Sequence, residues 1–359
     1  MSTNKRKLLN RYHVVFLVQS TMFGTGVLSL PQRLSSLGYS QALFPLLFGV
    51  IASLSIWPMI WINSKYKNEN LFRINEILLG KWIGKSINLF IVLQFTLFLA
   101  AIISSYMNLI QTTALPEQTL TIPVLFFLLL LTYIVNGGIK SVARFCIMAF
   151  FITIPMLYFL RWAIEKGEMS HLFPLFNYNG HEFFEALRKG YLSILGYEVI
   201  MFYFPYIVNQ KKAYKHALVG IWISIFLCFI TTLVSVIYYS EWQLENIEFT
   251  VLHLFKAGEF SFIERIDIIG ITLWIFLILS TSAGYLWSAK KGLDSLRSKK
   301  KKYHVYLITI VIFAVVVMPI PLESQKKLFE GSYYVGYLLL VWPIFLSVVH
   351  ILRKKQVQQ

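Results

Sequence analysis

Charged residues are scarce in this chain, and acidic residues are the scarcest. Of 359 residues, 14% are charged, and Asp and Glu together number 17 against 33 Lys and Arg. Hydrophobic residues make up 57% of the chain, and the mean hydropathy is +0.63. A soluble domain carries about 25% charged residues. The composition therefore excludes a soluble globular protein and indicates a polytopic membrane protein.

Cysteine and the residue clusters typical of enzymes are also lacking. Cys146 and Cys228 each lie in the middle of an apolar run, where neither a disulfide framework nor a metal-ligand set can be assembled. The sequence has no HExxH, Walker loop, GxSxG or His/Cys cluster. His13 and His350 lie near the ends of apolar runs and are interpreted as interfacial. We therefore expect no enzyme, no cofactor and no bound metal.

Long apolar runs are what the chain has instead. Runs of about 17–25 residues are long enough to span a bilayer. The polar connections between them are too short for a soluble domain, so residues 1–359 are expected to form a single polytopic membrane domain. A short amphipathic helix lying on the membrane surface is expected within 63–85, where apolar residues recur at helical spacing. The ten predicted spans are 12–34, 40–62, 86–112, 121–137, 142–163, 189–208, 217–239, 266–289, 303–320 and 333–352.

The distribution of basic residues predicts the orientation. Lys and Arg in short loops are retained on the cytoplasmic side, and an inside N-terminus places 24 of the 33 there. Both termini are therefore predicted to be cytoplasmic. This asymmetry accounts for most of the net charge of +16, so no nucleic-acid partner is expected. Basic clusters such as Lys299–Lys302 are expected to contact anionic lipid headgroups of the bilayer.

Two of the spans contain matching interruptions. The first span carries the sequence Gly24-Thr25-Gly26 with Pro31 after it, and the sixth carries Gly196 with Pro205 after it. Spans one and six begin on opposite sides of the membrane. Interrupted helices in corresponding positions of two halves indicate an inverted-repeat transporter fold with its site at mid-membrane. We therefore predict an all-α protein of ten transmembrane helices in a 5+5 inverted repeat, about 12–163 and 189–352, with helices 1 and 6 broken.

The first interruption suggests a site for an anion. Unwinding at Gly24, Thr25 and Gly26 frees backbone groups that lipid cannot satisfy. The half-helix that follows, beginning near Val27, presents free N–H groups and a positive dipole end, which suit a substrate carboxylate. The alternative is that these glycines only let another helix approach closely.

The second interruption suggests a site for a cation. Glu198 lies in an otherwise uncharged run, Tyr191–Val208, and a carboxylate at bilayer depth persists only where it faces protein, water, a cation or a ligand. With the carbonyl groups freed at Gly196, it is predicted to hold an ammonium group or an inorganic cation. The alternative is a structural carboxyl, either protonated or hydrogen-bonded to a neighbouring helix.

Spans three and eight are expected to complete the site. Thr281 and Tyr285 are four residues apart and share one helix face, although hydroxyls of this kind often bond to their own helix backbone. In span three, Phe95 and Leu99 are candidates for a side-chain wall, with core packing as the alternative.

Three segments give the chain a family resemblance: FLVQSTMFGTGVLSLP, GYLSILGYEVIMFYFPYI, and FIERIDIIGITLWIF at 262–276. With these segments, its length and its ten spans, the chain resembles the B subunits of bacterial spore germinant receptors. These form the endospore germination permease family of the amino acid–polyamine–organocation superfamily, which has the LeuT-like fold. The resemblance implies a nutrient sensor, commonly for an amino acid, in the spore inner membrane beside an A subunit and a lipid-anchored C subunit.

The resemblance also implies a ligand pocket between spans 1, 3, 6 and 8. Three functions remain open: a receptor subunit for an amino-acid-like ligand, a proton- or sodium-coupled transporter of an amino acid or amine, and a structural or channel subunit. The pocket maps onto Gly24, Thr25, Gly26, Phe95, Leu99, Gly196, Tyr197, Glu198, Thr281 and Tyr285.

Overall fold

The computed structural model describes residues 8–114, 119–258, 266–296, 303–318 and 322–357, and the regular elements within them are all helical. The α-helices are α1 (Arg11–Met22), α2 (Leu30–Arg33), α3 (Phe44–Lys65), α4 (Leu71–Leu79), α5 (Lys81–Thr113), α6 (Thr121–Asn136), α7 (Ile139–Thr153), α8 (Arg161–Lys166), α9 (Gly180–Gly190), α10 (Ile200–Tyr203), α11 (Ala213–Tyr238), α12 (Glu241–Asn246), α13 (Thr250–His253), α14 (Ile266–Leu296), α15 (His304–Val317) and α16 (Leu322–Val357). Short 3₁₀ helices join them: η1 (Thr25–Val27), η2 (Ser35–Leu43), η3 (Ile154–Leu160), η4 (Met169–Leu172), η5 (Tyr191–Ile194), η6 (Tyr197–Val199), η7 (Phe204–Tyr206), η8 (Gln210–Lys212) and η9 (Leu254–Ala257).

The predicted all-α membrane architecture is confirmed. Six stretches within the described residues are long and apolar enough to cross a membrane, and α6 and α15 are shorter apolar helices. The remaining two predicted spans correspond to α1–α2 and to the segment η5–η7, and both are interrupted at the predicted glycines.

Two helices extend well beyond the apolar runs that predicted them. α5 begins at Lys81 rather than near 86, and α16 begins at Leu322 rather than near 333. The added turns of α16 contain Leu, Glu, Gln and Lys, which are good helix formers. Hydropathy finds the part of a helix that suits lipid, and it does not find polar turns that continue the same helix.

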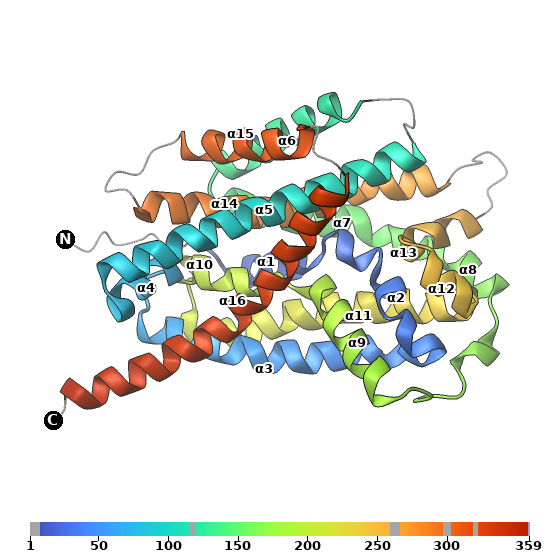
Figure 1. The fold of residues 1–359 in the computed structure, drawn as a ribbon, viewed down its shortest axis with the longest axis horizontal. Helices are drawn as coiled ribbons and strands as arrows, with labels where there is room; N and C mark the ends of the chain where they lie inside the picture. The colour runs from blue at the N-terminus through green and yellow to red at the C-terminus, as the bar shows by residue number, and fades with distance from the viewer. Residues whose placement is uncertain (1–7, 115–118, 259–265, 297–302, 319–321, 358–359) are drawn as a thin grey trace.

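Span one lies inside the bundle. α1 packs against α11, α7 and α14, while α14 in turn packs along α5 and α7. α16 crosses the near face of the bundle diagonally, and α6 and α15 form an outer layer beside α5 (Figure 1). The interruption in α1 is therefore surrounded by protein, which can satisfy its exposed backbone.

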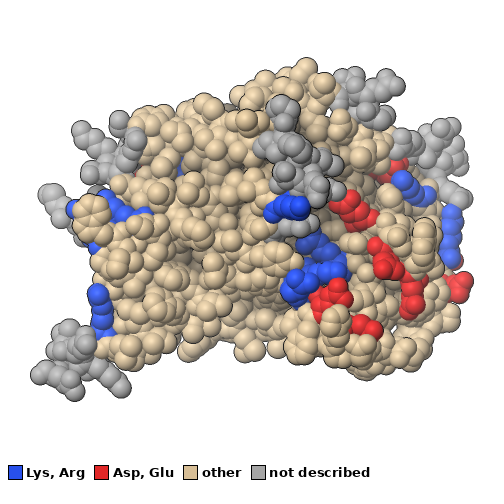
Figure 2. All heavy atoms as spheres, in the orientation of Figure 1, with Lys and Arg blue, Asp and Glu red and all other residues tan. Residues whose placement is uncertain are grey.

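At one end of the bundle, hydrogen bonds connect segments that are far apart in the sequence. The Leu9 N–H donates to the Tyr206 carbonyl at 3.0 Å, so the start of span one lies beside the end of span six. Arg353 donates to the Ile77 carbonyl at 3.2 Å, which brings the end of α16 to the same region. Acidic side chains gather instead at the other end, where α9 and α12 lie (Figure 2).

The predicted amphipathic helix in 63–85 is α4. The Asn70 side chain accepts the Arg73 N–H at 3.2 Å and caps its first turn. Leu71, Ile74 and Leu78 are buried against the bundle, because they recur on one face of the helix. α4 packs along α5, so this short helix belongs to the folded bundle.

Candidate ligand site between two helix breaks

The first break begins where α1 ends at Met22. Gly24 is extended (φ −107°, ψ −161°), and the chain resumes as η1 and then α2. Thr281 of α14 fills the gap, because its Oγ1 donates to the Ser20 carbonyl at 2.7 Å and also contacts the Phe23 carbonyl. The same hydroxyl lies 3.0 Å from the Leu277 carbonyl of its own helix. The hydroxyl has one hydrogen, so the carbonyl groups of the break and of its own helix are alternative acceptors for it.

The second break touches the first. Gly196 has φ +136°, a region that side chains rarely adopt. A Cβ at this position would collide with the Thr21 carbonyl of α1. A Cβ added at Gly26 would lie 2.9 Å from the Ser193 Cα. The glycines therefore allow the two interrupted segments to approach each other closely, in addition to freeing their backbones.

A small cavity lies between the breaks, and we call it the central cavity. Its volume is about 20 Å³, enough for about one water molecule. A molecule the size of an amino acid would need several times this space. The lining residues are Thr21, Met22, Gly24, Thr25, Gly26, Arg33, Phe98, Ile102, Leu192, Ser193, Leu195 and Thr281.

The predicted site residues divide into two groups around this cavity. Gly24, Thr25, Gly26 and Thr281 line it. The other six are buried without being among its lining residues: Phe95, Leu99, Gly196, Tyr197, Glu198 and Tyr285.

Phe95 joins three of the four predicted spans. Its ring meets the rings of Phe202 in α10 and Tyr285 in α14 edge-on, each at 5.2 Å between centroids. Leu99, one turn further along α5, is fully buried. These contacts hold spans three, six and eight together beside the cavity.

Glu198 is held by protein groups in this arrangement. One carboxylate oxygen accepts the Gly196 N–H at 2.7 Å, and the other accepts the Tyr285 hydroxyl at 2.8 Å. The residue is 4% exposed. Its carboxyl group therefore lies two residues from the second break and is bonded across to α14. Tyr197 beside it bonds to Ser55 at 2.6 Å and to Tyr191 at 2.7 Å.

Eight of the twelve lining residues were not predicted by the sequence analysis, and two of the polar ones are Ser193 and Arg33. Ser193 is 5% exposed, and its hydroxyl has no hydrogen-bond partner among the described residues. Arg33 lines the central cavity and also an outer polar pocket of about 370 Å³. Ser193 could have been found from its position three residues before Gly196. Arg33 could have been found as a basic residue at the end of span one.

The outer pocket carries charges of both signs. It is lined by Arg33, Ser35, Ser36, Glu182, Glu185, Lys189 and Glu245. The Lys189 ammonium lies 2.6 Å from a Glu185 oxygen, and this hydrogen bond lowers the pKa of the Glu185 carboxyl. Since Arg33 belongs to both spaces, it lies between the outer pocket and the central cavity.

The fold defines the class of protein. The structure superimposes on Mhp1, a nucleobase-cation-symport-1 family transporter solved in a closed conformation with bromovinylhydantoin bound, with a TM-score of 0.64 over 94% of this chain and 79% of that one. The two sequences are 11% identical, so the likeness concerns the fold alone. This protein is therefore a helical membrane protein of the LeuT-like transporter fold.

The family follows from sequence. Residues 8–326 match the spore permease family, described as "Spore germination protein", and the chain belongs to that family. Spore germination protein GerQB of Bacillus cereus is 25% identical over 97% of this chain and 96% of its own length. Spore germination protein B2 of Bacillus subtilis (strain 168) is 26% identical over 95% of both chains.

Proposed function

We propose that this protein is the nutrient-sensing B subunit of a spore germinant receptor and that its ligand is an amino acid or a similar zwitterion. Ligand binding shifts the population between a closed and an open arrangement of the bundle, and partner A and C subunits respond to that shift. The protein lies in the spore inner membrane with both termini on the cytoplasmic side.

The observation that carries this proposal is the contact between two helix breaks around one cavity. The end of α1 at Met22 presents the negative end of a helix dipole. The segment from Gly24 begins the 3₁₀ turn η1, whose first backbone N–H groups have no acceptor within the turn. An ammonium group is favoured at the end of α1, and a carboxylate is favoured at the segment that begins with Gly24. Arg33 adds a cation on the carboxylate side, and Ser193 adds a buried hydroxyl.

A ligand screen by thermal shift on the purified protein tests the proposal. Binding stabilises the folded state by about 2.7 kcal/mol when the ligand is at 100 times its Kd. We expect one or a few amino acids to raise the midpoint in a saturable way, while their amide and decarboxylated analogues do not. A complete set of amino acids without effect would contradict an amino-acid ligand.

Gly24→Ala is expected to separate ligand binding from folding. Gly24 lines the cavity, and a Cβ added there meets no atom within 4 Å. Its extended backbone suits alanine, so the protein should accumulate normally. The added methyl group enlarges a residue that lines the cavity, and we expect at least about a tenfold rise in the ligand concentration for half-maximal response.

Gly26→Ala is the matched comparison for this variant. Its methyl group would meet the Ser193 backbone, so we expect it to reduce accumulation of the protein in the membrane. Membrane immunoblots and dose-response curves measure both variants. A Gly24→Ala protein with unchanged dose response would remove the central cavity from ligand binding.

A second candidate function is cation-coupled transport. Thr281 Oγ1 lies close to the carbonyl oxygens of Ser20, Phe23 and Leu277, yet a hydroxyl has a single hydrogen to donate. The hydroxyl therefore satisfies one of these carbonyl groups at a time. A cation could be coordinated by the other carbonyl oxygens together with Oγ1, since carbonyl groups at unwound segments coordinate Na⁺ or H⁺ in transporters. Uptake of the ligand into liposomes against its gradient, dependent on Na⁺ or H⁺, would support transport. Saturable binding without flux would support the receptor.

A further inference from the structure

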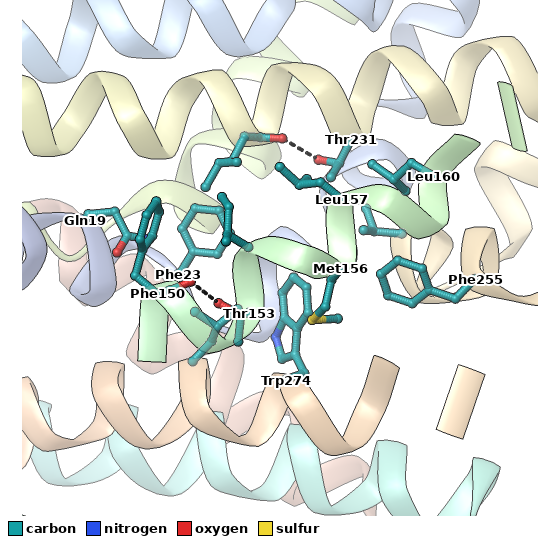
Figure 3. A pocket seen from close by; sticks show the side chains of 14 residues that line it. Gln19, Phe23, Phe150, Thr153, Met156, Leu157, Leu160, Thr231, Phe255 and Trp274 are labelled. Atoms are coloured by element: carbon teal, nitrogen blue, oxygen red, sulfur yellow. Dashed lines mark hydrogen bonds between the residues drawn. The ribbon is translucent and has the colours of Figure 1, made fainter. Parts of the chain in front are cut away.

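A second cavity, which we call the side cavity, also adjoins the end of α1, but through other residues than those that line the central cavity. Gln19 and Phe23 line it from α1, and Trp274 and Leu277 line it from α14. Its volume is about 50 Å³. Figure 3 shows Gln19 near one end, Phe255 near the other, and the Trp274 ring rising between them. The last turn of α1 therefore contributes side chains to both cavities.

The side cavity exists because span five is kinked. Pro155 lacks an N–H and cannot continue the helical bonding of α7. α7 ends at Thr153, and the chain continues as the 3₁₀ helix η3 before α8. The side chains of η3 then face α11, α13 and α14 across the cavity.

Two hydrogen-bond donors at this cavity lack acceptors among the described residues. They are Nε2 of Gln19, a fully buried residue, and Nε1 of Trp274, which is 5% exposed. A buried donor without an acceptor costs about 1–3 kcal/mol, and native proteins avoid most such cases. The Thr153 and Thr231 hydroxyls donate to their own helices, so they retain only acceptor capacity toward the cavity.

The rest of the lining limits what can satisfy these donors. The lining residues in the described part of the chain include no ionisable side chain, and apart from Gln19, Thr153, Thr231 and Trp274 they are hydrophobic. A charged molecule would be desolvated without a counter-charge. The volume fits about three or four water-sized atoms. A small neutral molecule with an acceptor oxygen matches the size, the apolar walls and the free donors.

A lipid-facing groove provides access for such a molecule. Four residues line both the groove and the side cavity: Phe150, Ile154, Leu157 and Leu227. The groove has a volume of about 620 Å³ and is apolar except for Lys215. These four shared hydrophobic side chains therefore lie between the groove and the side cavity.

We propose that the side cavity is a second ligand site, for a small neutral molecule that carries a hydrogen-bond acceptor oxygen. The molecule accepts from Trp274 Nε1 or Gln19 Nε2, and its apolar part packs against Phe23 and Leu277. It contacts the residue that precedes Gly24, so it is positioned to act on the break of α1. This site is independent of the ligand proposed for the central cavity.

The test uses three probes of nearly the same shape: acetone, isobutene and acetate. Acetone has an acceptor and no charge, isobutene has neither, and acetate is charged. The full-length protein, labelled with 5-fluorotryptophan at its nine Trp residues, is followed by ¹⁹F NMR in detergent, and Trp274→Phe assigns the relevant signal. We expect acetone to shift that signal with saturation, isobutene to bind about two- to twelvefold more weakly, as expected for one hydrogen bond, and acetate to have no effect.

Gln19→Leu keeps the side-chain size and removes the amide donor. It should weaken the binding of acetone by up to about tenfold and leave the affinity for isobutene unchanged. Trp82→Phe, at a position that is 87% exposed, is the matched control for Trp274→Phe. It should change neither the affinity for acetone nor the affinity for isobutene. Once Trp274→Phe has assigned the signal, the comparison of the three probes uses the wild-type protein alone. Equal affinities for acetone and isobutene, shifts that rise linearly without saturation, or a high-resolution map with only water in the cavity would each overturn the proposal.

Discussion

Gly196→Ala is expected to abolish accumulation of the folded protein. The position has φ +136°, which costs a residue with a side chain about 1–3 kcal/mol. The new Cβ would also collide with the backbone of Thr21, which cannot move aside as a flexible side chain does. Overpacking of this kind costs about 1–3 kcal/mol more. Because native proteins are stable by only about 5–15 kcal/mol, we expect little protein in membrane fractions and a lower thermal midpoint for what remains.

Gly80→Ala separates the two causes. Gly80 also has positive φ, +87°, yet a Cβ added there meets no atom within 4 Å. This control should show the cost of the backbone conformation alone and should accumulate close to wild type. If both variants lose the same stability, the contact between the two breaks contributes nothing measurable. If Gly196→Ala is as stable as wild type, the two segments do not meet as described.

The fold was predictable from sequence because its main signal is hydropathy averaged over about 20 residues, which depends little on any single residue. Apolar runs gave the spans, and Gly24, Gly26 and Gly196 marked both interruptions. Gly24 has an extended backbone, Gly26 lies in close contact with Ser193, and Gly196 has positive φ. The start of α16 was misplaced because its first turns are polar, and polarity alone does not end a helix.

The site was less predictable. In a regular helix, the spacing of two residues fixes whether their side chains point the same way, and a helix break removes this relation. Thr281 and Tyr285 lie in the regular helix α14, and both reach the broken segments from one face, as their spacing of four predicted. In the sixth span, extended and 3₁₀ residues alternate around Gly196. Helical periodicity therefore did not reveal that Ser193 lines the cavity while Glu198 bonds back to the Gly196 N–H.

Glu198→Gln is expected to remove most of the nutrient response while the protein still accumulates. The amide oxygen can accept the Gly196 N–H, and the amide NH₂ can donate to the Tyr285 oxygen, so both present contacts can be rebuilt. The negative charge beside the second break is lost. A hydrogen bond to a charged group contributes about 1.5–3 kcal/mol, so we expect the half-maximal ligand concentration to rise by about 10- to 150-fold.

Tyr285→Phe shows whether the charge itself acts. It removes the phenol that donates to Glu198 and leaves both the ring packed on Phe95 and the carboxylate in place. Spores carrying each variant as the sole receptor are compared by dose response, with membrane immunoblots for accumulation. A larger loss in Glu198→Gln than in Tyr285→Phe indicates that the charge holds the ligand cation. Equal losses would indicate that Glu198 acts by fixing α14 to the second break, and a wild-type response in Glu198→Gln would remove this carboxylate from the site.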